Sequence, residues 1–261
     1  MTPPAPESAL LAARGVAVRR GGRLLLSGVD LELRPGRLVH LAGRNGDGKT
    51  SLLRVLAGLA RAHAGTVRRA GRWAFVPEKV VLAPQVRGGE WLAALGALRG
   101  APRVDWRAAV EASGLDGDVL DRPAAAMSKG MLQRLALVEA FASGAAVLAL
   151  DEPFSGLDPD GRAWLSERAA AHARNGGAVV LTDHSGTAQT QLPPAERWAI
   201  ADGACVAEPA GAPAAAASRV VVVAVDRAGV RRRDAVDEDA VDAHLRTLLD
   251  AGWHIERVGR A

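Results

Sequence analysis

A glycine-rich loop contains the residue types that bind the phosphates of a nucleotide. Residues 43–51 read Gly-Arg-Asn-Gly-Asp-Gly-Lys-Thr-Ser and contain the pattern Gly-x-x-x-x-Gly-Lys-Thr. Glycines let the backbone curl so that successive N–H groups point at phosphate oxygens. The lysine can reach the β- and γ-phosphates, and the threonine hydroxyl can coordinate Mg²⁺. The predicted nucleotide-binding residues of this loop are Gly43, Asn45, Gly46, Gly48, Lys49, Thr50 and Ser51.

Two consecutive acids, Asp151 and Glu152, follow the apolar run 146–150 and precede a proline. An acid at the end of a buried strand is the usual companion of a phosphate loop, where Asp151 would hold Mg²⁺ through water. Glu152 comes one residue later and would point to the opposite side, where a carboxylate can act as the base for an attacking water. The pair therefore predicts hydrolysis of the bound nucleotide.

Strands and helices alternate around both motifs. The apolar run 38–42 precedes the loop, and residues 52–59 after it place apolar side chains at helical spacing. The runs 146–150 and 178–182 read as buried strands, with a helix expected over 162–173 between them. Such alternation is typical of a largely parallel sheet with phosphate chemistry at the strand ends. We expect an α/β fold with the core of a P-loop NTPase.

Shorter elements are expected around this core. Before the loop, Val16 and Val18 suggest one strand, and residues 24–26 and 29–33 suggest another, with turns at the glycines between them. We expect the helix after the loop to end at Ala64-Gly65. Two further strands are predicted at 66–68 and 73–76, and a mostly helical subdomain at 85–142, with helices at 91–97, 107–112 and 133–142.

The last fifty residues differ in character from the rest. Residues 209–218 are rich in proline and alanine, which is typical of a linker. After it we predict strands at 219–226 and 230–233, a helix at 237–249 and a final strand at 253–258. The expected domains are a disordered leader at 1–9, an ATPase domain at 10–208, the linker at 209–218, and a small β-β-α-β appendage at 219–261.

The composition excludes several classes of protein. The formal net charge is +4, but the positive charges are mainly arginines spread along the chain, with no basic run interleaved with aromatic residues, so we expect no nucleic-acid partner. Cys205 is the single cysteine, which excludes a disulfide framework and a cysteine-based zinc site. No apolar segment reaches the length of a membrane span, and residues 1–8 lack the order of a signal peptide. We expect a cytoplasmic chain that contacts the membrane only through a partner.

Five motifs in order resemble those of the ATP-binding cassette (ABC) ATPases, the nucleotide-binding subunits of ABC transporters. Residues 43–51 resemble the Walker A loop, and 147–152 resemble Walker B with its catalytic glutamate. Met-Ser-Lys-Gly-Met at 127–131 is similar to the Leu-Ser-Gly-Gly-Gln signature, and Ser-Gly-Leu-Asp at 155–158 matches the D-loop. His184 lies where the switch histidine would be. The resemblance covers residues 10–208.

This resemblance implies a composite site made by two chains. Each ATP, with Mg²⁺, would lie between the Walker A loop of one chain and the signature of a second, in a homodimer. Ser128 and the amide of Gly130 would contact the γ-phosphate across the interface, near the start of a helix expected from Met131; a helix N-terminus suits an anion. His184 would contact the γ-phosphate within its own chain, and Asp158 would organise the interface. Closing and reopening would drive an integral membrane permease.

The chain departs from the family pattern in three ways, one of which is a short stretch between the Walker A loop and Glu78, where we expect the arm that covers the base to be trimmed. Arg20 is nearest in register to the aromatic residue that usually stacks on adenine; a guanidinium can also stack on a base, and a solvated arginine is the alternative. Glu78 replaces the Q-loop glutamine, where it could ligate Mg²⁺ or orient water. The Pro-Glu sequence here and the Ser-Lys-Gly-Met of the signature resemble ABC-2 type export cassettes. Asp47 adds an acid close to the phosphates, and we expect its side chain to point away.

Several functions are consistent with these motifs. The main hypothesis is the ATPase subunit of an exporter of the ABC-2 type, acting through separate membrane subunits. A haem-exporter-type cassette is the alternative, because those chains are also short. A soluble, non-transport ABC ATPase usually has zinc modules, coiled coils or a second cassette, which this sequence lacks. A regulator that hydrolyses ATP poorly is the third possibility, based on Glu78 and the missing aromatic residue. No residue set in the chain identifies a cargo.

Overall fold

The computed structural model describes residues 9–99, 104–183, 192, 196–208, 219–225, 231–237 and 241–260. The chain forms two compact units, residues 1–210 and residues 211–261. Among the described residues, no helix is long and apolar enough to cross a membrane.

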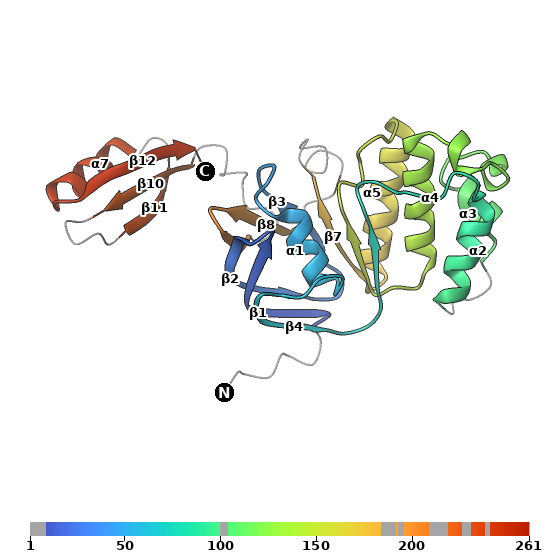
Figure 1. The fold of residues 1–261 in the computed structure, drawn as a ribbon, viewed down its shortest axis with the longest axis horizontal. Coiled ribbons are helices and arrows are strands. Elements are labelled where there is room, and N and C mark those ends of the chain that lie inside the picture. The colour runs from blue at the N-terminus through green and yellow to red at the C-terminus, as the bar shows by residue number, and fades with distance from the viewer. Residues whose placement is uncertain are drawn as a thin grey trace. The chain divides into compact units, whose positions relative to one another are not determined.

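A six-stranded sheet forms the centre of the first unit (Figure 1). Its strand order is β5-β6-β7-β3-β8-β9, and every neighbouring pair is parallel except β8 and β9. All residues of β3, β6 and β7 are buried, as expected for parallel strands covered on both faces. The predicted parallel sheet is therefore confirmed. The strands are β3 (Leu38–Ala42), β5 (Trp73–Val76), β6 (Val147–Leu150), β7 (Ala178–Thr182), β8 (Glu196–Ala201) and β9 (Ala204–Glu208).

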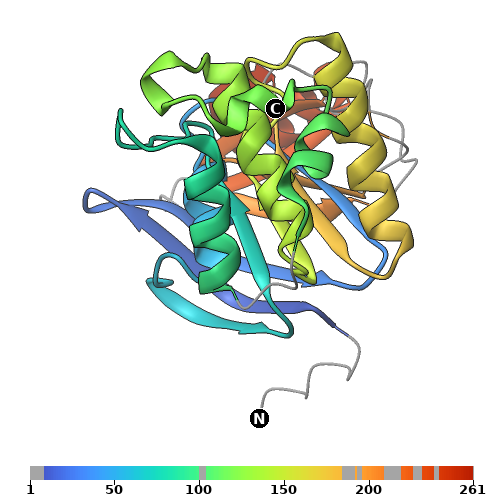
Figure 2. The same cartoon turned by 90° about the vertical axis from the view of Figure 1, so that its right-hand side faces the viewer.

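Helices cover both faces of this sheet. Helix α1 (Lys49–Leu56) packs on one face in a core shared with the N-terminal strands. Helices α4 (Lys129–Ala142) and α5 (Pro159–Arg174) pack on the other face, where they lie next to each other (Figure 2). Because residues alternate between the two cores along each strand, β6 places Val147 and Ala149 in the first core and Leu148 and Leu150 in the second.

A second sheet, antiparallel and three-stranded, has the order β2-β1-β4. Strands β1 (Leu11–Arg20) and β2 (Arg23–Leu33) are continuous, so the short runs expected before the loop belong to two long strands. The helix after the loop ends at Leu56 and not at Ala64, because Gly58 follows it with a φ of +82°. Ala64 and Gly65 instead begin β4 (Ala64–Arg69).

The helical subdomain contains α2 (Gly88–Leu98), α3 (Trp106–Glu111), two short 3₁₀ turns (Gly117–Leu120 and Ala124–Ala126) and α4. The helices lie close to the ranges predicted for them. A small core of their own holds them together; its buried members are Leu92, Val110, Val119, Leu135 and Val138. This core fixes the start of α4, where the signature residues lie.

The hairpin β8–β9 is absent from the sequence-based prediction. Its turn is Asp202-Gly203, with φ values of +55° and +83°, which is the conformation that Asp-Gly adopts in a two-residue hairpin. Trp198 in β8 is fully buried against the central strand β3. An Asp-Gly pair between short apolar runs was the available signal.

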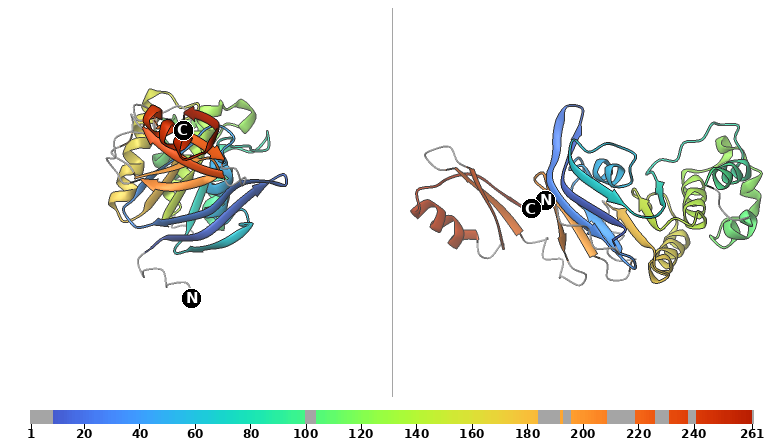
Figure 3. Two further views of the ribbon diagram at one scale, coloured as in Figure 1. Left: turned by 90° about the vertical axis from the view of Figure 1, so that its left-hand side faces the viewer. Right: turned by 90° about the horizontal axis from the view of Figure 1, so that it is seen from below.

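The second unit is a three-stranded antiparallel sheet with one helix (Figure 3). The elements are β10 (Arg219–Val225), β11 (Arg231–Asp237), α7 (Val241–Asp250) and β12 (His254–Arg260), in the predicted β-β-α-β order. Strand β10 lies between the other two, and Val222 and Ala224 pack with Val241 and Leu248 of α7. The predicted linker at 209–218 and the leader up to residue 8 lie outside the described residues.

Candidate nucleotide-binding and hydrolysis site

The phosphate loop connects β3 to α1, in the strand–loop–helix context that its sequence predicts. Gly46 and Gly48 have φ values of +92° and +102°, which favour glycine. Lys49 is buried, and its Nζ donates hydrogen bonds to the carbonyl oxygens of Gly43 (2.8 Å) and Arg44 (3.2 Å). The loop's own carbonyls thus hold the ammonium group over the loop.

The N-terminus of α1 is available to an anion. Gly48 occupies the N-cap position, and no side chain caps the first N–H groups of the helix. These donors and the helix dipole favour a phosphate. The Asp47 side chain is bound within the loop, because its Oδ2 accepts a hydrogen bond from the Arg44 N–H at 2.6 Å. Asp47 therefore stabilises the bend of the loop that it belongs to.

The two Walker B acids follow β6 and meet the loop. Asp151 Oδ1 accepts hydrogen bonds from the hydroxyls of Thr50 (3.0 Å) and Thr182 (2.8 Å), and Thr182 Oγ1 also accepts one from the Glu152 N–H (2.8 Å). These contacts bring together the start of α1 and the ends of β6 and β7. Thr182, which the sequence analysis missed, connects both acids; a hydroxyl at the end of a buried apolar strand was its only signal.

Asp151 is only 3% exposed, and this burial raises the pKa of its carboxyl group. Hydrogen bonds from Thr182 and Thr50 oppose the rise, as does the charge of Lys49, whereas the charge of Glu78 adds to it. A cation would relieve this penalty. Among the residues that the structure describes, no group of three or more acids, histidines or cysteines could hold a metal ion. The hydroxyl of Thr50 and the carboxylate of Asp151 are oxygen donors that suit Mg²⁺, which is commonly bound by one or two protein groups together with phosphates.

Glu152 has an unusual backbone conformation. Its φ is +50°, in the left-handed region that non-glycine residues rarely adopt, and the residue is 9% exposed. Residues in strained backbone conformations cluster at functional sites, and they persist only where the surrounding structure holds them. Here the hydrogen bond from the Glu152 N–H to Thr182 contributes to holding it. The geometry is suited to a fixed carboxylate next to Asp151.

Glu78 follows β5, the neighbour of β6 in the sheet. It is half-buried, and its charge contributes to the raised pKa of Asp151. The structure thus places Glu78 on the same side of the sheet as the Walker B acids. A carboxylate beside a bound phosphate can ligate a metal ion or orient water.

The signature forms the N-terminus of α4. Ser128 is the N-cap residue, and its Oγ accepts a hydrogen bond from the Met131 N–H at 3.2 Å. The helix begins at Lys129 and not at Met131 as predicted, because the Ser128 cap already satisfies the first turn. Ser128 is exposed, so its hydroxyl is accessible to a second molecule.

The D-loop lies beside the signature. Asp158 is the N-cap residue of α5, and its Oδ1 accepts a hydrogen bond from the Gly161 N–H at 2.7 Å. This hydrogen bond lowers the pKa of the Asp158 carboxyl group. The Arg134 guanidinium pairs with the same oxygen. A cavity of about 300 Å³ opens between the two motifs and is lined by Ser128, Gly130, Gly156 and Asp158, among others. The sequence analysis did not single out Arg134.

Two predicted site residues, His184 and Arg20, stay predictions. His184 lies outside the described residues. Arg20 is exposed at the end of β1, and within the described part of the chain no hydrogen bond or ion pair connects it to the phosphate loop. Stacking of Arg20 on adenine stays a prediction.

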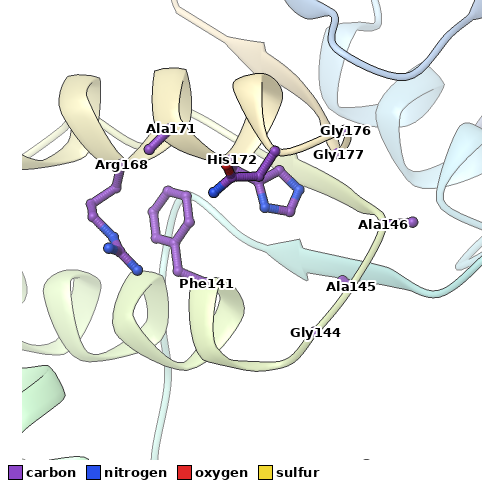
Figure 4. Close-up of a pocket in the computed structure, with 10 residues that line it drawn as sticks. Phe141, Gly144, Ala145, Ala146, Arg168, Ala171, His172, Gly176 and Gly177 are labelled. Carbon is purple, nitrogen blue, oxygen red and sulfur yellow. The ribbon is translucent and has the colours of Figure 1, made fainter.

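A second cavity, of about 350 Å³, lies between α4 and α5 at the other end of the sheet (Figure 4). Arg168 lies over the Phe141 ring, with its guanidinium carbon 5.7 Å from the ring centroid, and the His172 ring packs nearby. Ala146 and Gly177, which precede β6 and β7, also line it. Because the acids follow the opposite ends of these strands, this cavity is separate from the phosphate site.

The chain matches known proteins in sequence and in structure. The family model of the ABC transporter matches residues 26–155. The cytochrome c biogenesis ATP-binding export protein CcmA of Novosphingobium aromaticivorans is 43% identical over 175 residues, which cover 67% of this chain and 88% of the relative. The protein of the same name in Bordetella bronchiseptica is 41% identical over 199 residues, covering 68% of this chain and 84% of the relative.

A solved ATP-binding subunit of an ABC transporter has a TM-score of 0.68 at 24% identity and covers 76% of this chain and 89% of its own. An ABC transporter ATP-binding protein from Pyrococcus furiosus has a TM-score of 0.59 at 22% identity, covering 67% and 90%. These structures show the fold. The sequence relatives show that the chain belongs to the ATP-binding proteins of ABC transporters.

Proposed function

We propose that this chain is the Mg²⁺-dependent, ATP-hydrolysing subunit of an exporter, and that it acts as a homodimer with an integral membrane permease. One observation carries the proposal: Thr50 and Asp151 share a hydrogen bond beside a phosphate loop, next to the strained Glu152. Mg²⁺ would be held by Thr50, Asp151 and the phosphates, and it would neutralise phosphate charge there.

Within this chain each group has a distinct role. Lys49 and the N-terminus of α1 bind the phosphates, and Glu152 accepts the proton of the attacking water. Glu78 orients water or completes the metal site. Ser128 and the Gly130 amide contact the γ-phosphate bound by the partner chain, Asp158 holds the interface, and His184 contacts the γ-phosphate in its own chain. The permease carries the chain to the cytoplasmic face of the membrane.

The relatives favour the haem-exporter alternative over the ABC-2 type. Both reported sequence relatives are named for export in cytochrome c biogenesis, and cytochrome c carries covalently attached haem. We propose an export step in the same process for this chain. Expression in a host that lacks its own cytochrome c biogenesis export ATPase tests this: the wild-type chain should restore haem-stained c-type cytochromes, and the Glu152→Gln variant should not.

An ABC-2 type exporter is the second candidate. Glu78 in place of glutamine and the Ser-Lys-Gly-Met signature favour it. Failure to restore c-type cytochromes, combined with recovery of the chain in a complex with a multi-span permease, would favour this candidate. Recovery with nucleic acid in place of a permease would contradict both candidates.

A further inference from the structure

Lys129 bridges the signature and the D-loop of its own chain. It is the first residue of α4, and its Nζ donates a hydrogen bond to Ser155 Oγ at 2.9 Å. Its aliphatic stem lies over Gly156: a Cβ atom placed on that glycine would be 3.6 Å from Lys129 Cδ. The roles proposed above use neither Lys129 nor Ser155. The family pattern Leu-Ser-Gly-Gly-Gln has a glycine at position 129, which could not make this bond.

The two segments are also in close backbone contact. A Cβ atom on Gly130 would lie 2.5 Å from the carbonyl oxygen of Gly156, so only a glycine fits at position 130. Further along the helix, the buried Arg134 pairs with Asp158. Positions 129, 130 and 134 of α4 therefore hold the D-loop from its first residue to its last. A shift of the signature relative to the D-loop would break these contacts.

The D-loop is connected in turn to Glu152, the proposed catalytic base. The Ser155 N–H donates a hydrogen bond to the carbonyl oxygen of Glu152 at 3.1 Å, closing a tight turn. A continuous series of contacts thus runs from Lys129 through Ser155 to Glu152. In the proposed dimer, the signature and Glu152 of one chain serve different nucleotides.

We propose that Lys129 is a positioning residue that couples the two nucleotide sites: through Ser155 it holds Glu152 in its working orientation when the signature engages the nucleotide of the partner chain. This inference rests on the proposed function. The bond is exposed and modest, so its effect lies in orientation, and the loss should appear in kcat more than in KM.

Steady-state hydrolysis of Mg-ATP by the full-length chain tests the coupling. Lys129→Met removes the donor and keeps the stem, and Ser155→Ala removes the acceptor. Each should lower kcat roughly three- to tenfold, the loss expected for one hydrogen bond. KM should change by less than about twofold. The double variant should be no slower than the slower single variant, because both remove the same contact. Lys129→Arg, which keeps a donor, should retain most of the activity.

Ser166→Ala is the matched control, because its hydroxyl donates only within α5, to the Arg162 carbonyl oxygen (2.9 Å). Its kcat should equal that of the wild type.

Additive losses in the double variant, or a loss with Lys129→Met alone, would overturn the inference, because the lysine would then act on another group such as the partner's phosphates. Unchanged kcat in all variants would overturn it too. Ser155→Ala carries the test if Lys129→Met does not fold. A wild-type chain without turnover would instead contradict the proposed function.

Discussion

The two halves of the proposed composite site are built in opposite ways. The half around the phosphate loop is buried: Asp151 and Glu152 lie among Thr50, Thr182 and Lys49. The half around the signature is exposed and consists of a capped helix end at Ser128. Buried acids cost free energy in the empty chain, whereas a solvated helix cap contributes to its stability. The phosphate-loop half therefore destabilises the empty chain, whereas the signature half does not.

The largest expected effect is on hydrolysis. Glu152→Gln removes the base but keeps the shape of the side chain, so turnover should fall by about 10²- to 10⁴-fold while ATP binding persists. Phosphate release and equilibrium nucleotide binding measure the two quantities. Glu167→Gln, an exposed acid on α5, is the control and should hydrolyse ATP at the wild-type rate. Turnover within a factor of about ten of the wild type would show that Glu152 is not the base.

Variants in the two halves should affect ATP binding and ATP turnover differently. Lys49→Met removes a buried ammonium, so a single chain should bind ATP about 10- to 100-fold more weakly. Ser128→Asp keeps a good N-cap but places a negative charge against the partner's γ-phosphate. That variant should bind ATP like the wild type and lose turnover. Equal weakening of single-chain binding in both variants would contradict a division of the site between two chains.

Removing the charge of Asp151 should stabilise the empty chain. Burial raises the pKa of this carboxyl group, so the folded chain holds the proton more tightly than the unfolded chain. The stability that the protonated Asp151 carboxyl group contributes is thus complete below its ordinary pKa in the unfolded chain. This contribution is lost as the pH rises through the raised pKa of the folded chain. At neutral pH, Asp151→Asn should therefore raise the free energy of unfolding and the Tm of the empty chain. The gain should vanish in acid; a lower Tm at neutral pH would refute the argument.

The last effect concerns the helix cap. Ser128→Ala removes the acceptor for the Met131 N–H and should lower the free energy of unfolding by about 1 kcal/mol. Ser128→Asp should lower it less, because aspartate also caps helices. Thermal unfolding of the two Ser128 variants and of Asp151→Asn shows whether substitutions in the two halves change the stability of the empty chain in opposite directions. A gain in stability for Ser128→Ala would remove the contrast between them.

Contiguous motifs were predictable because their chemistry depends on neighbours in sequence. The loop 43–51 and the pair Asp151 and Glu152 each lie in one segment, and the flanking apolar runs fixed the strand or helix that positions them. The fully buried apolar strands β3, β6 and β7 were predictable for the same reason.

Contacts between distant segments were not predictable. Thr182 acts on residues about thirty positions away, and Arg134 reaches both Ser113 and Asp158. The parallel pairing of β6 with β7, and the packing of α4 against α3 and α5, create these contacts. Strands β8 and β9 were missed although each contains an uninterrupted apolar run, at 198–201 and 204–207, and the pairing of β8 with β3 stabilises them.

Mixing two inactive variants tests the central claim, that each ATP is hydrolysed between the phosphate loop of one chain and the signature of another. Lys49→Met and Ser128→Asp each disable both sites of a homodimer, but a mixed dimer regains one intact site, formed by the loop of one variant and the signature of the other. At equal amounts, random pairing makes half of the dimers mixed, so ATPase activity should recover to roughly a quarter of the wild-type level. A mixture no faster than its separate components would contradict the shared site.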